Sequence, residues 1–543
     1  MTFPALIDWL DDRLNPIVVK ELRQAVKSRL VVSILMLFLG IQLFLLGIFL
    51  VKREAQGDMG ADWNAGNEAF IIQQIILLWT IAIIIPAYAA VRLGAERSDQ
   101  NVDLMFSSTL SPSSIIWGKF FATLLLGMLV FSTCAPFMTF TYLLRGIDIP
   151  TILFSLGMDL LVMLFNIMFA LFLASLPGNR IMKFIYSFIG FILLVILTYR
   201  LSGASYALTE GLGFLDTVVE YWPVALSFVA GVFALMGLFY SYAVAIISPP
   251  TSNRMFPVRL FLMGLVVVSL GGSVISSYTV TPDAQTAPII LFQFIVMPIL
   301  CFQIWISICE REQIGPRVRR AIPRNFLLRP FAFLLFTGSA GGILFSVLLI
   351  GGSLAICALW LTTMAYTSPT VFGRNEDSAW FALLIHGLMA LYVYCYGQTA
   401  VLVRRYLLSN QIRPGYTWVI AGLLVGIGTT IPPMFAYFAL SDQVRYSNDS
   451  GWWLIPNPFI SYMDLLWDGP RRGFTFKDFD LMCLWFLLTW ATLVTLLSVP
   501  WFGQQIRGFY PPRPKPDNDN EELAALILLE ADPEPEPKMG VQG

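Results

Sequence analysis

Residues 287–309 read APIILFQFIVMPILCFQIWISIC, a run of 23 residues without a charged side chain. An α-helix rises about 1.5 Å per residue, so roughly 20 apolar residues cross the hydrocarbon core of a bilayer. Because the bilayer core offers no water to backbone N–H and C=O groups, a run of this length is expected to cross it as a helix. This stretch decides the class: an α-helical integral membrane protein.

Similar apolar runs recur along the whole chain. Only 13% of the 543 residues are charged and 57% are hydrophobic, whereas an ordinary soluble domain is about one quarter charged. The composition therefore excludes a soluble globular protein and predicts an all-α polytopic membrane protein with about 12 transmembrane helices. The predicted spans are 29–51, 70–93, 116–143, 152–176, 182–199, 222–247, 258–280, 287–309, 331–363, 379–403, 416–440 and 480–505.

Basic residues gather in alternate connecting segments, as expected of cytoplasmic loops. The basic residues on that side are Arg13, Lys20, Arg23, Lys27, Arg29, Arg97, Lys119, Arg180, Lys183, Arg254, Arg259, Arg311, Arg317, Arg319, Arg320, Arg324, Arg329, Arg404, Arg405 and Arg413. The opposite side is poor in them, apart from Lys52 and Arg53 and the long loop 441–479. Both termini are therefore predicted to be cytoplasmic. The net charge of −1 gives no reason to expect a nucleic-acid partner.

The two ends of the chain differ from the middle. Residues 1–28 precede the first span and are expected to contain an amphipathic elbow helix. Residues 509–543 are rich in proline and acidic residues, which predicts a disordered cytoplasmic tail. Within the tail, residues 521–530 could alternatively form one or two helical turns that dock on a partner.

The elbow begins with Asn15, a good helix cap, followed by Pro16 at the first helical position. Lys20 and Arg23 share one face of this helix, while Val18 and Leu22 share another, as expected of a helix in the membrane interface. Ile17, Val18, Glu21 and Leu22 do not form a clean stripe. The alternative that this helix only fixes topology stays open.

A second polar segment follows the second span. Glu96 and Arg97 end an extended helix, and residues 101–112 (NVDLMFSSTLSP) form a short amphipathic element before the chain re-enters the membrane at Gly118 and Lys119. Its candidate docking residues are Asp103, Leu104, Met105, Phe106, Leu110 and Pro112. The alternative is an ordinary cytoplasmic loop.

Together these two stretches resemble the permease subunit of ABC-2 type transporters. The matching residues are Asn15-Pro16, Lys20-Glu21-Leu22-Arg23, Ser28-Arg29, Glu96-Arg97, Asp103-Leu104, Ser107, Leu110-Ser111-Pro112 and Gly118-Lys119. In that family the first stretch is similar to the elbow helix and the second to the coupling segment that meets an ATP-binding subunit. The resemblance is specific over about residues 12–125.

The second half echoes the first, which predicts two six-span units, 29–250 and 251–508. Residues 253–259 (NRMFPVR) resemble a degenerate elbow, and the eighth span ends in Glu310-Arg311 as the second ends in Glu96-Arg97. A second coupling segment would therefore comprise Glu310, Arg311, Arg317, Arg319, Arg320 and Arg324. Chance similarity of two short Glu-Arg pairs is the competing account.

The chain carries no phosphate-binding Gly-x-x-x-x-Gly-Lys-Ser/Thr loop and a single histidine. We therefore expect no enzyme activity, no metal and no cofactor in this chain, with ATP and Mg²⁺ held by a separate cytoplasmic subunit. Asp159, Asn166 and His386 are polar residues inside spans, where polar groups often mark a transport pathway. A structural role is expected for His386, and Asp159 could instead lie near the outer interface.

These observations favour a permease that exports an unknown substrate, energised by a separate ATP-binding subunit. The resemblance implies a bacterial inner (cytoplasmic) membrane. Two alternatives stay open: an ATP-independent secondary transporter with internal repeats, and a non-transporting membrane scaffold for a cytoplasmic complex.

Overall fold

The computed structural model describes residues 15–56, 65–96, 111–144, 147–178, 180–211, 214–249, 251–279, 285–367, 376–408, 412–439, 454–460, 462–463 and 478–510. All regular elements in these ranges are helices, and twelve of them are long and apolar enough to cross a membrane. The prediction of a twelve-span, all-α, multi-pass membrane protein is confirmed at this level.

The helix boundaries agree with the apolar runs to within a few residues, except where polar ends prolong a helix and in the ninth run. The short helices outside the spans are α2 (Pro16–Val26), α13 (Pro316–Arg320) and α14 (Arg329–Leu335). The spanning helices are α3 (Arg29–Gln56), α4 (Ala65–Trp79) continued by η1 (Thr80–Ile84) and α5 (Ile85–Glu96), α7 (Pro112–Leu143), α8 (Ile149–Ser175), α9 (Arg180–Gly211), α10 (Phe214–Ile247), α11 (Phe256–Ser277), α12 (Ala287–Ile308), α15 (Ser339–Thr367), α17 (Glu376–Leu402) continued by η3 (Val403–Leu407), α18 (Thr417–Ala439) and α21 (Asp478–Gly508).

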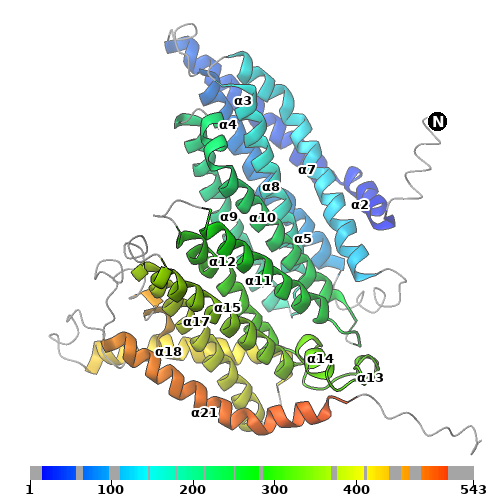
Figure 1. Ribbon diagram of the computed structural model, residues 1–543. Helices are drawn as coiled ribbons and strands as arrows, with labels where there is room; N and C mark the ends of the chain where they lie inside the picture. Colours follow the sequence, from blue (N-terminus) through cyan, green and yellow to red (C-terminus); the bar gives the residue numbers. More distant parts are fainter. Residues whose placement is uncertain are drawn as a thin grey trace, which may run out of the picture.

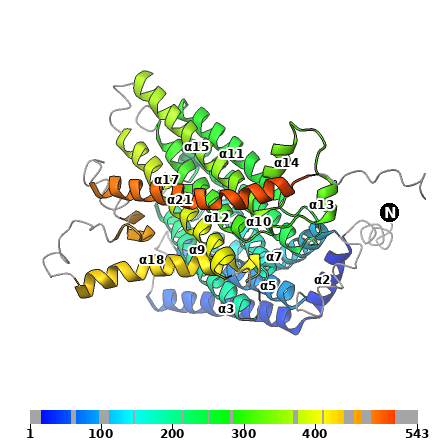
Figure 2. The ribbon, with the colours of Figure 1, turned by 90° about the horizontal axis from the view of Figure 1, so that it is seen from below.

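The interior is built around α12, which packs against α11, α15 and α17, and around α8, which packs against α5 and α10. Figures 1 and 2 show α12 inside the bundle and α2 at its periphery. One apolar core runs through both groups, from Leu77 of α4 through Met163 of α8 to Ile304 of α12 and Trp360 of α15. The outer helices expose large apolar side chains, such as Phe44 on α3 and Phe188 on α9. A lipid environment would cover such faces.

The second span contains a local irregularity with a clear cause. Pro86 has no N–H, so the carbonyl of Ala82, four residues earlier, lacks its usual partner. The helix widens to a π-turn over Thr80–Ile84, and the amide of Asn166 on α8 donates to Ala82 O at 2.9 Å. Asn166 therefore satisfies a backbone group that the proline leaves open.

The ninth apolar run is not one helix, contrary to the prediction of a continuous span over 331–363. The chain ends α14 at Leu335, is extended at Phe336, and begins α15 at Ser339. The Arg259 guanidinium of α11 accounts for the break, because it donates to the carbonyls of Leu334, Phe336 and Gly338. A buried cation thus replaces the helical hydrogen bonds that the break removes.

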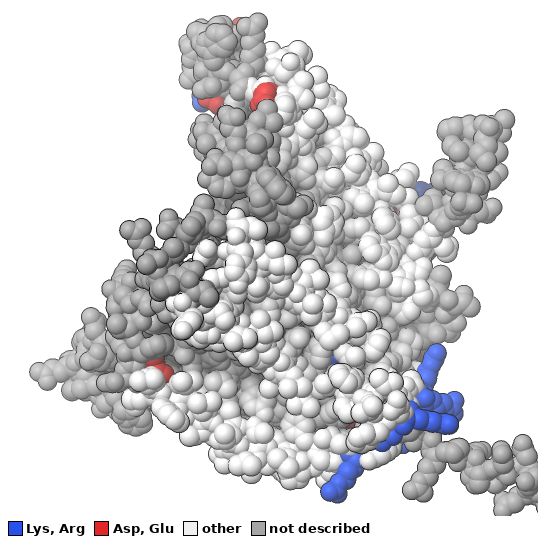
Figure 3. All heavy atoms as spheres, viewed as in Figure 1, with Lys and Arg blue, Asp and Glu red and all other residues white. Residues whose placement is uncertain are grey.

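Most charged residues lie near the ends of the helices, and Asp159 within α8 is an exception. In Figure 3 the arginine and lysine side chains gather near α13 and α14, while the visible acidic side chains lie mainly at the opposite ends of the bundle. The position of these charges away from the helix middles follows from the cost of placing charges inside a bilayer.

Candidate functional site

Asn15 fixes the elbow helix α2 to the start of α7. Its Oδ1 accepts from the N–H of Ile17 at 3.0 Å, which caps α2. Its Nδ2 donates to the carbonyl and hydroxyl oxygens of Ser114 at 2.7 and 2.9 Å. The sequence predicted the cap, and the structure adds the second contact, which joins residues 99 positions apart.

Close packing of α2 on α7 depends on Gly118. A Cβ atom at this position would lie 2.7 Å from the Cβ of Ile17 and 3.2 Å from Nδ2 of Asn15. No side chain fits there without a shift of α2, because real Cβ atoms do not come this close to other carbons. The Gly-Lys pair of the sequence motif therefore places a contact point for the elbow directly before Lys119.

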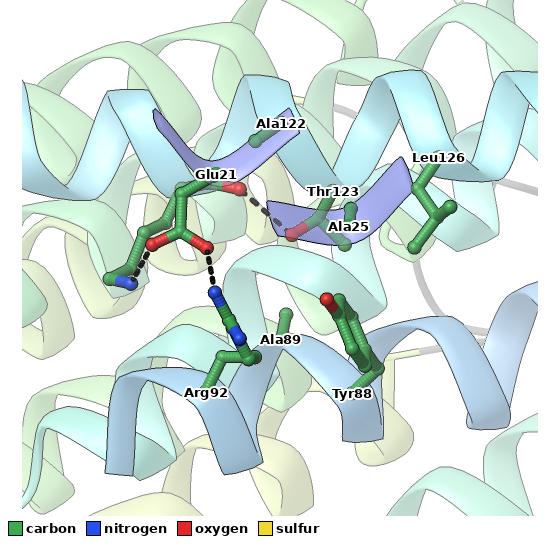
Figure 4. A pocket seen from close by; sticks show the side chains of 9 residues that line it. Glu21, Ala25, Tyr88, Ala89, Arg92, Ala122, Thr123 and Leu126 are labelled. Atoms are coloured by element: carbon green, nitrogen blue, oxygen red, sulfur yellow. Dashed lines mark hydrogen bonds and ion pairs between the residues drawn. The ribbon is translucent and has the colours of Figure 1, made fainter. Parts of the chain in front are cut away.

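A network of charged side chains connects α2, α5 and α7. The Lys119 ammonium lies 2.7 Å from Oε1 of Glu21 and 2.7 Å from Oε2 of Glu96. Arg92 reaches the other oxygen of Glu21 at 3.3 Å, and Lys20 lies 3.5 Å from Glu96. Figure 4 shows Glu21 between two cationic side chains, with Arg92 labelled on the neighbouring helix.

Two members of this charge network are buried. Glu21 is 6% exposed and Lys119 is 4% exposed, while Glu96 and Arg92 reach solvent. Burial by itself would raise the pKa of Glu21, but Lys119, and then Arg92, outweigh it and hold the pKa below its ordinary value. Glu21 is therefore ionised at neutral pH and forms a charged joint between the elbow and α7.

A small cavity opens beside this joint. Its lining comes from α2, the second span and α7: Glu21, Ala25, Tyr88, Ala89, Arg92, Lys119, Ala122, Thr123 and Leu126. The charged groups already pair with each other, so the arrangement suits a mechanical connection between helices better than catalysis. Among the residues that the structure describes, no group of three or more His, Cys, Asp or Glu side chains is placed to hold a metal ion.

The structure brings together residues that the sequence analysis placed in two separate motifs. Lys20 and Glu21 come from the elbow motif, and Glu96 comes from the second motif. Pro112 occupies the first turn of α7, which Ser111 caps. Arg23 is exposed on α2. The remaining residues of the first docking prediction lie outside the described residues: Arg97, Asp103, Leu104, Met105, Phe106 and Leu110.

The second predicted coupling segment divides into a buried acid and exposed arginines. Both oxygens of Glu310 accept from Arg259, at 2.5 and 2.6 Å, and one also accepts the Gly338 N–H at 2.8 Å. This carboxylate therefore supports the fold rather than the surface. The exposed members of the segment are Arg311, Arg317, Arg319, Arg320 and Arg324.

Glu312 connects this segment to the tenth span. Its carboxylate accepts from Arg404 and Arg405 at the end of that span. Arg404 is buried and also donates to the hydroxyl of Thr417 at the start of α18. Ion pairs thus connect the end of the tenth span to its neighbours, as ion pairs do at the end of the second span.

The three polar residues predicted inside spans have different surroundings. Asn166 bonds to Ala82, as described above, and the His386 Nδ1 lies 2.6 Å from the Ala382 carbonyl of its own helix, with the ring edge-on to Phe294. These two side chains are buried structural groups. Asp159 is 1% exposed, and its carboxylate accepts hydrogen bonds from the amide of Gln74 at 3.4 and 3.5 Å.

Sequence reasoning missed the partners of these groups. Lys119 and Arg259 count in the sequence only as cytoplasmic-side and motif residues, and Arg92 is not singled out there, although a charge within or at the edge of an apolar run needs a partner. That rule could have identified them as paired residues. It could not have named the partners, which lie up to 98 residues away.

Comparisons with known proteins give no relative: no family model, no curated protein and no solved structure matches this chain.

Proposed function

We propose that the chain is the transmembrane subunit of a transporter of the ABC-2 permease type, driven by a separate cytoplasmic ATP-binding subunit. The observation that carries the proposal is the convergence of Lys20-Glu21, Glu96 and Gly118-Lys119 in one charge network. These residues come from the motifs on which the resemblance rests. Because the two motifs contact each other in the charge network, they can act together.

In this proposal the charge network transfers force from the cytoplasm to the spans. Residues 97–110 connect α5 to α7, and both helices end in the charge network. A displacement of this segment by an ATPase would act on Glu96 and Lys119 together, and through Glu21 on the elbow. The two spans would then tilt as one unit with α2, as packed elements move in rigid-body switches.

The contacts in the second half support a duplication. Asn15 binds Ser114 in the first turn of the third span. In the same relative place, Asn253 accepts from the N–H and hydroxyl of Thr337, at 2.9 and 3.0 Å, just before α15. An acid at the end of the second span of each half is also paired, although the partners differ: Glu96 pairs with Lys119 of the third span, and Glu310 pairs with Arg259 of the seventh span. These parallels favour two six-span units with a pathway between them.

The position of the charges supports the proposed topology. The charge network and the arginines of residues 311–324 would face the cytoplasm, together with both termini, in agreement with the positive-inside rule. The family resemblance favours export and a bacterial inner membrane. No described residue names the substrate.

Co-purification tests the proposal. The tagged chain is extracted from its native membrane in mild detergent after crosslinking, and the proteins that accompany it are identified by mass spectrometry. We expect a stoichiometric ATPase with phosphate-binding loops, whose amount falls at least several-fold in the Glu96→Ala/Arg97→Ala variant. The matched control is Lys52→Ala/Glu54→Ala. It also removes one charge of each sign, but from the C-terminal end of α3, which is the end away from the elbow.

Three outcomes would contradict the proposal. Absence of such an ATPase after crosslinking rejects the ABC assignment. Equal loss in the control variant shows a general defect and not a docking site. If an ATPase binds but the chain does not stimulate its ATP hydrolysis and the complex transports nothing, the chain is a scaffold.

One observation favours a second candidate, an ATP-independent secondary transporter. Asp159 is a buried carboxyl that pairs with no cation among the described residues, and such groups often bind coupling ions. Ion-driven uptake by the purified chain in proteoliposomes without ATP, lost in Asp159→Asn, would favour this candidate over the first.

A further inference from the structure

Five exposed arginines form a basic surface around α13 and the end of α21. They are Arg317, Arg319, Arg320, Arg324 and Arg507. Arginines and lysines gather in this region of Figure 3. None of the five forms an ion pair within the described part of the chain. The basic surface therefore has unused charge for an acidic partner.

Exposed apolar side chains adjoin the basic surface. Phe326 is 77% exposed, Leu327 is 73% exposed and Phe331 is 65% exposed. They lie on the connection between α13 and α14 and on α14 itself. A partner that carries both acidic and apolar residues would match this combination.

The last described residues, Phe509 and Tyr510, lie at this place. Phe509 is buried against Ile322 and Ala332, and the guanidinium of Arg329 lies 4.9 Å from the ring centre of Tyr510. Residues 511–543 follow directly. They therefore start beside the basic surface.

The composition of residues 511–543 complements that surface. The segment between Pro516 and Pro537 has no basic residue and eight acidic ones: Asp517, Asp519, Glu521, Glu522, Glu530, Asp532, Glu534 and Glu536. Residues 523–529 (LAALILL) supply an apolar stretch within it. An extended chain covers at most about 3.6 Å per residue, so Asp517 comes within about 25 Å of Tyr510, close enough to reach α13.

We propose that the acidic segment 517–536 binds the basic surface of its own chain and covers it, with residues 523–529 against the exposed side chains of Phe326, Leu327 and Phe331. Each exposed ion pair is weak, so several pairs act together. The covalent connection keeps the segment at a high effective concentration.

Protection from proteolysis tests this in the intact chain. The protein is placed in phosphatidylcholine nanodiscs and treated with an endoprotease that cuts after glutamate, and cleavage after Glu530 is followed by intact mass. The free peptide 511–543 supplies the reference rate at each salt concentration. We expect cleavage in the chain to be slower by on the order of tenfold at low salt, with the difference disappearing in 0.5 M NaCl.

Two matched variants locate the contact. Arg319→Ser/Arg320→Ser should restore most of the free-peptide rate, whereas Lys27→Ser/Arg29→Ser, which removes two exposed cations beside the elbow, should leave protection unchanged. A second variant, Asp517→Asn/Asp519→Asn, weakens the contact from the tail side without touching α13. Its cleavage after Glu530 should also speed up.

The other occupants give distinct results. A wild-type tail cut as fast as the free peptide in phosphatidylcholine overturns the proposal. Protection that persists in Arg319→Ser/Arg320→Ser also overturns it, because the tail then lies elsewhere. If the surface binds anionic lipid headgroups instead, the wild-type protein should retain more phosphatidylglycerol from phosphatidylglycerol nanodiscs than Arg319→Ser/Arg320→Ser does. The tails of the two proteins should then be cut at equal rates.

Discussion

Replacing Glu21 with glutamine removes the charge that joins the elbow helix to α7 and keeps the size of the side chain. The Lys119 ammonium would lose its ion pair with Glu21, at 2.7 Å, but keep its ion pair with Glu96, at 2.7 Å. Breaking a fully buried pair costs about 3–5 kcal/mol. Because Glu96 remains and Arg92 is partly exposed, we expect a loss of about 2 kcal/mol in the free energy of unfolding.

A double-mutant cycle isolates the pair. In Lys119→Met, Glu21 keeps its ion pair with Arg92 and Glu96 keeps its ion pair with Lys20. The loss in the free energy of unfolding should therefore be similar or somewhat larger, about 2–3 kcal/mol. The double variant Glu21→Gln/Lys119→Met leaves neither buried charge and should be more stable than the sum of the single effects by about 1–3 kcal/mol.

Unfolding in mixed micelles of a mild detergent and dodecyl sulfate, followed by tryptophan fluorescence, measures these differences. Lys20→Met is the matched control, because Lys20 is 58% exposed and 3.5 Å from Glu96; its effect should stay below about 0.5 kcal/mol. Strictly additive single effects, or a control that costs as much as Glu21→Gln, would refute the buried charge network as the connection between elbow and α7.

Three further predictions follow from the same geometry. Because the pKa of Glu21 is held below its ordinary 4.5, its stabilisation is complete above about pH 4.5 and is lost as the pH falls through the lower folded value, so acid titration should destabilise wild type more steeply than Glu21→Gln. Gly118→Val would force apart α2 and α7 at Ile17 and should raise hydrogen exchange in the elbow, whereas Gly94→Val, which meets open space, should not. Asn166→Leu removes the donor to a buried carbonyl in the π-turn, and thermal unfolding in detergent should report a loss of about 1–3 kcal/mol; an unchanged midpoint would show that the carbonyl is satisfied in another way.

The sequence by itself determined the class, the number of spans and the start of the elbow. These features are local: about twenty apolar residues must cross a bilayer as a helix, and Asn15 and Pro16 favour a helix start by their own chemistry. The ninth run shows where this reasoning ends. Its composition is that of one long span, but Arg259 supports a break by satisfying three carbonyls.

Only the tertiary structure decided which charges meet. The sequence gives Glu21 no partner, yet the approach of Gly118 to Ile17 brings it to Lys119. In the same way Glu310, which resembles a docking residue, is buried by Arg259. Hydropathy depends on neighbours along the chain, whereas an ion pair depends on the distance between helices, and that distance is set by packing in the assembled bundle.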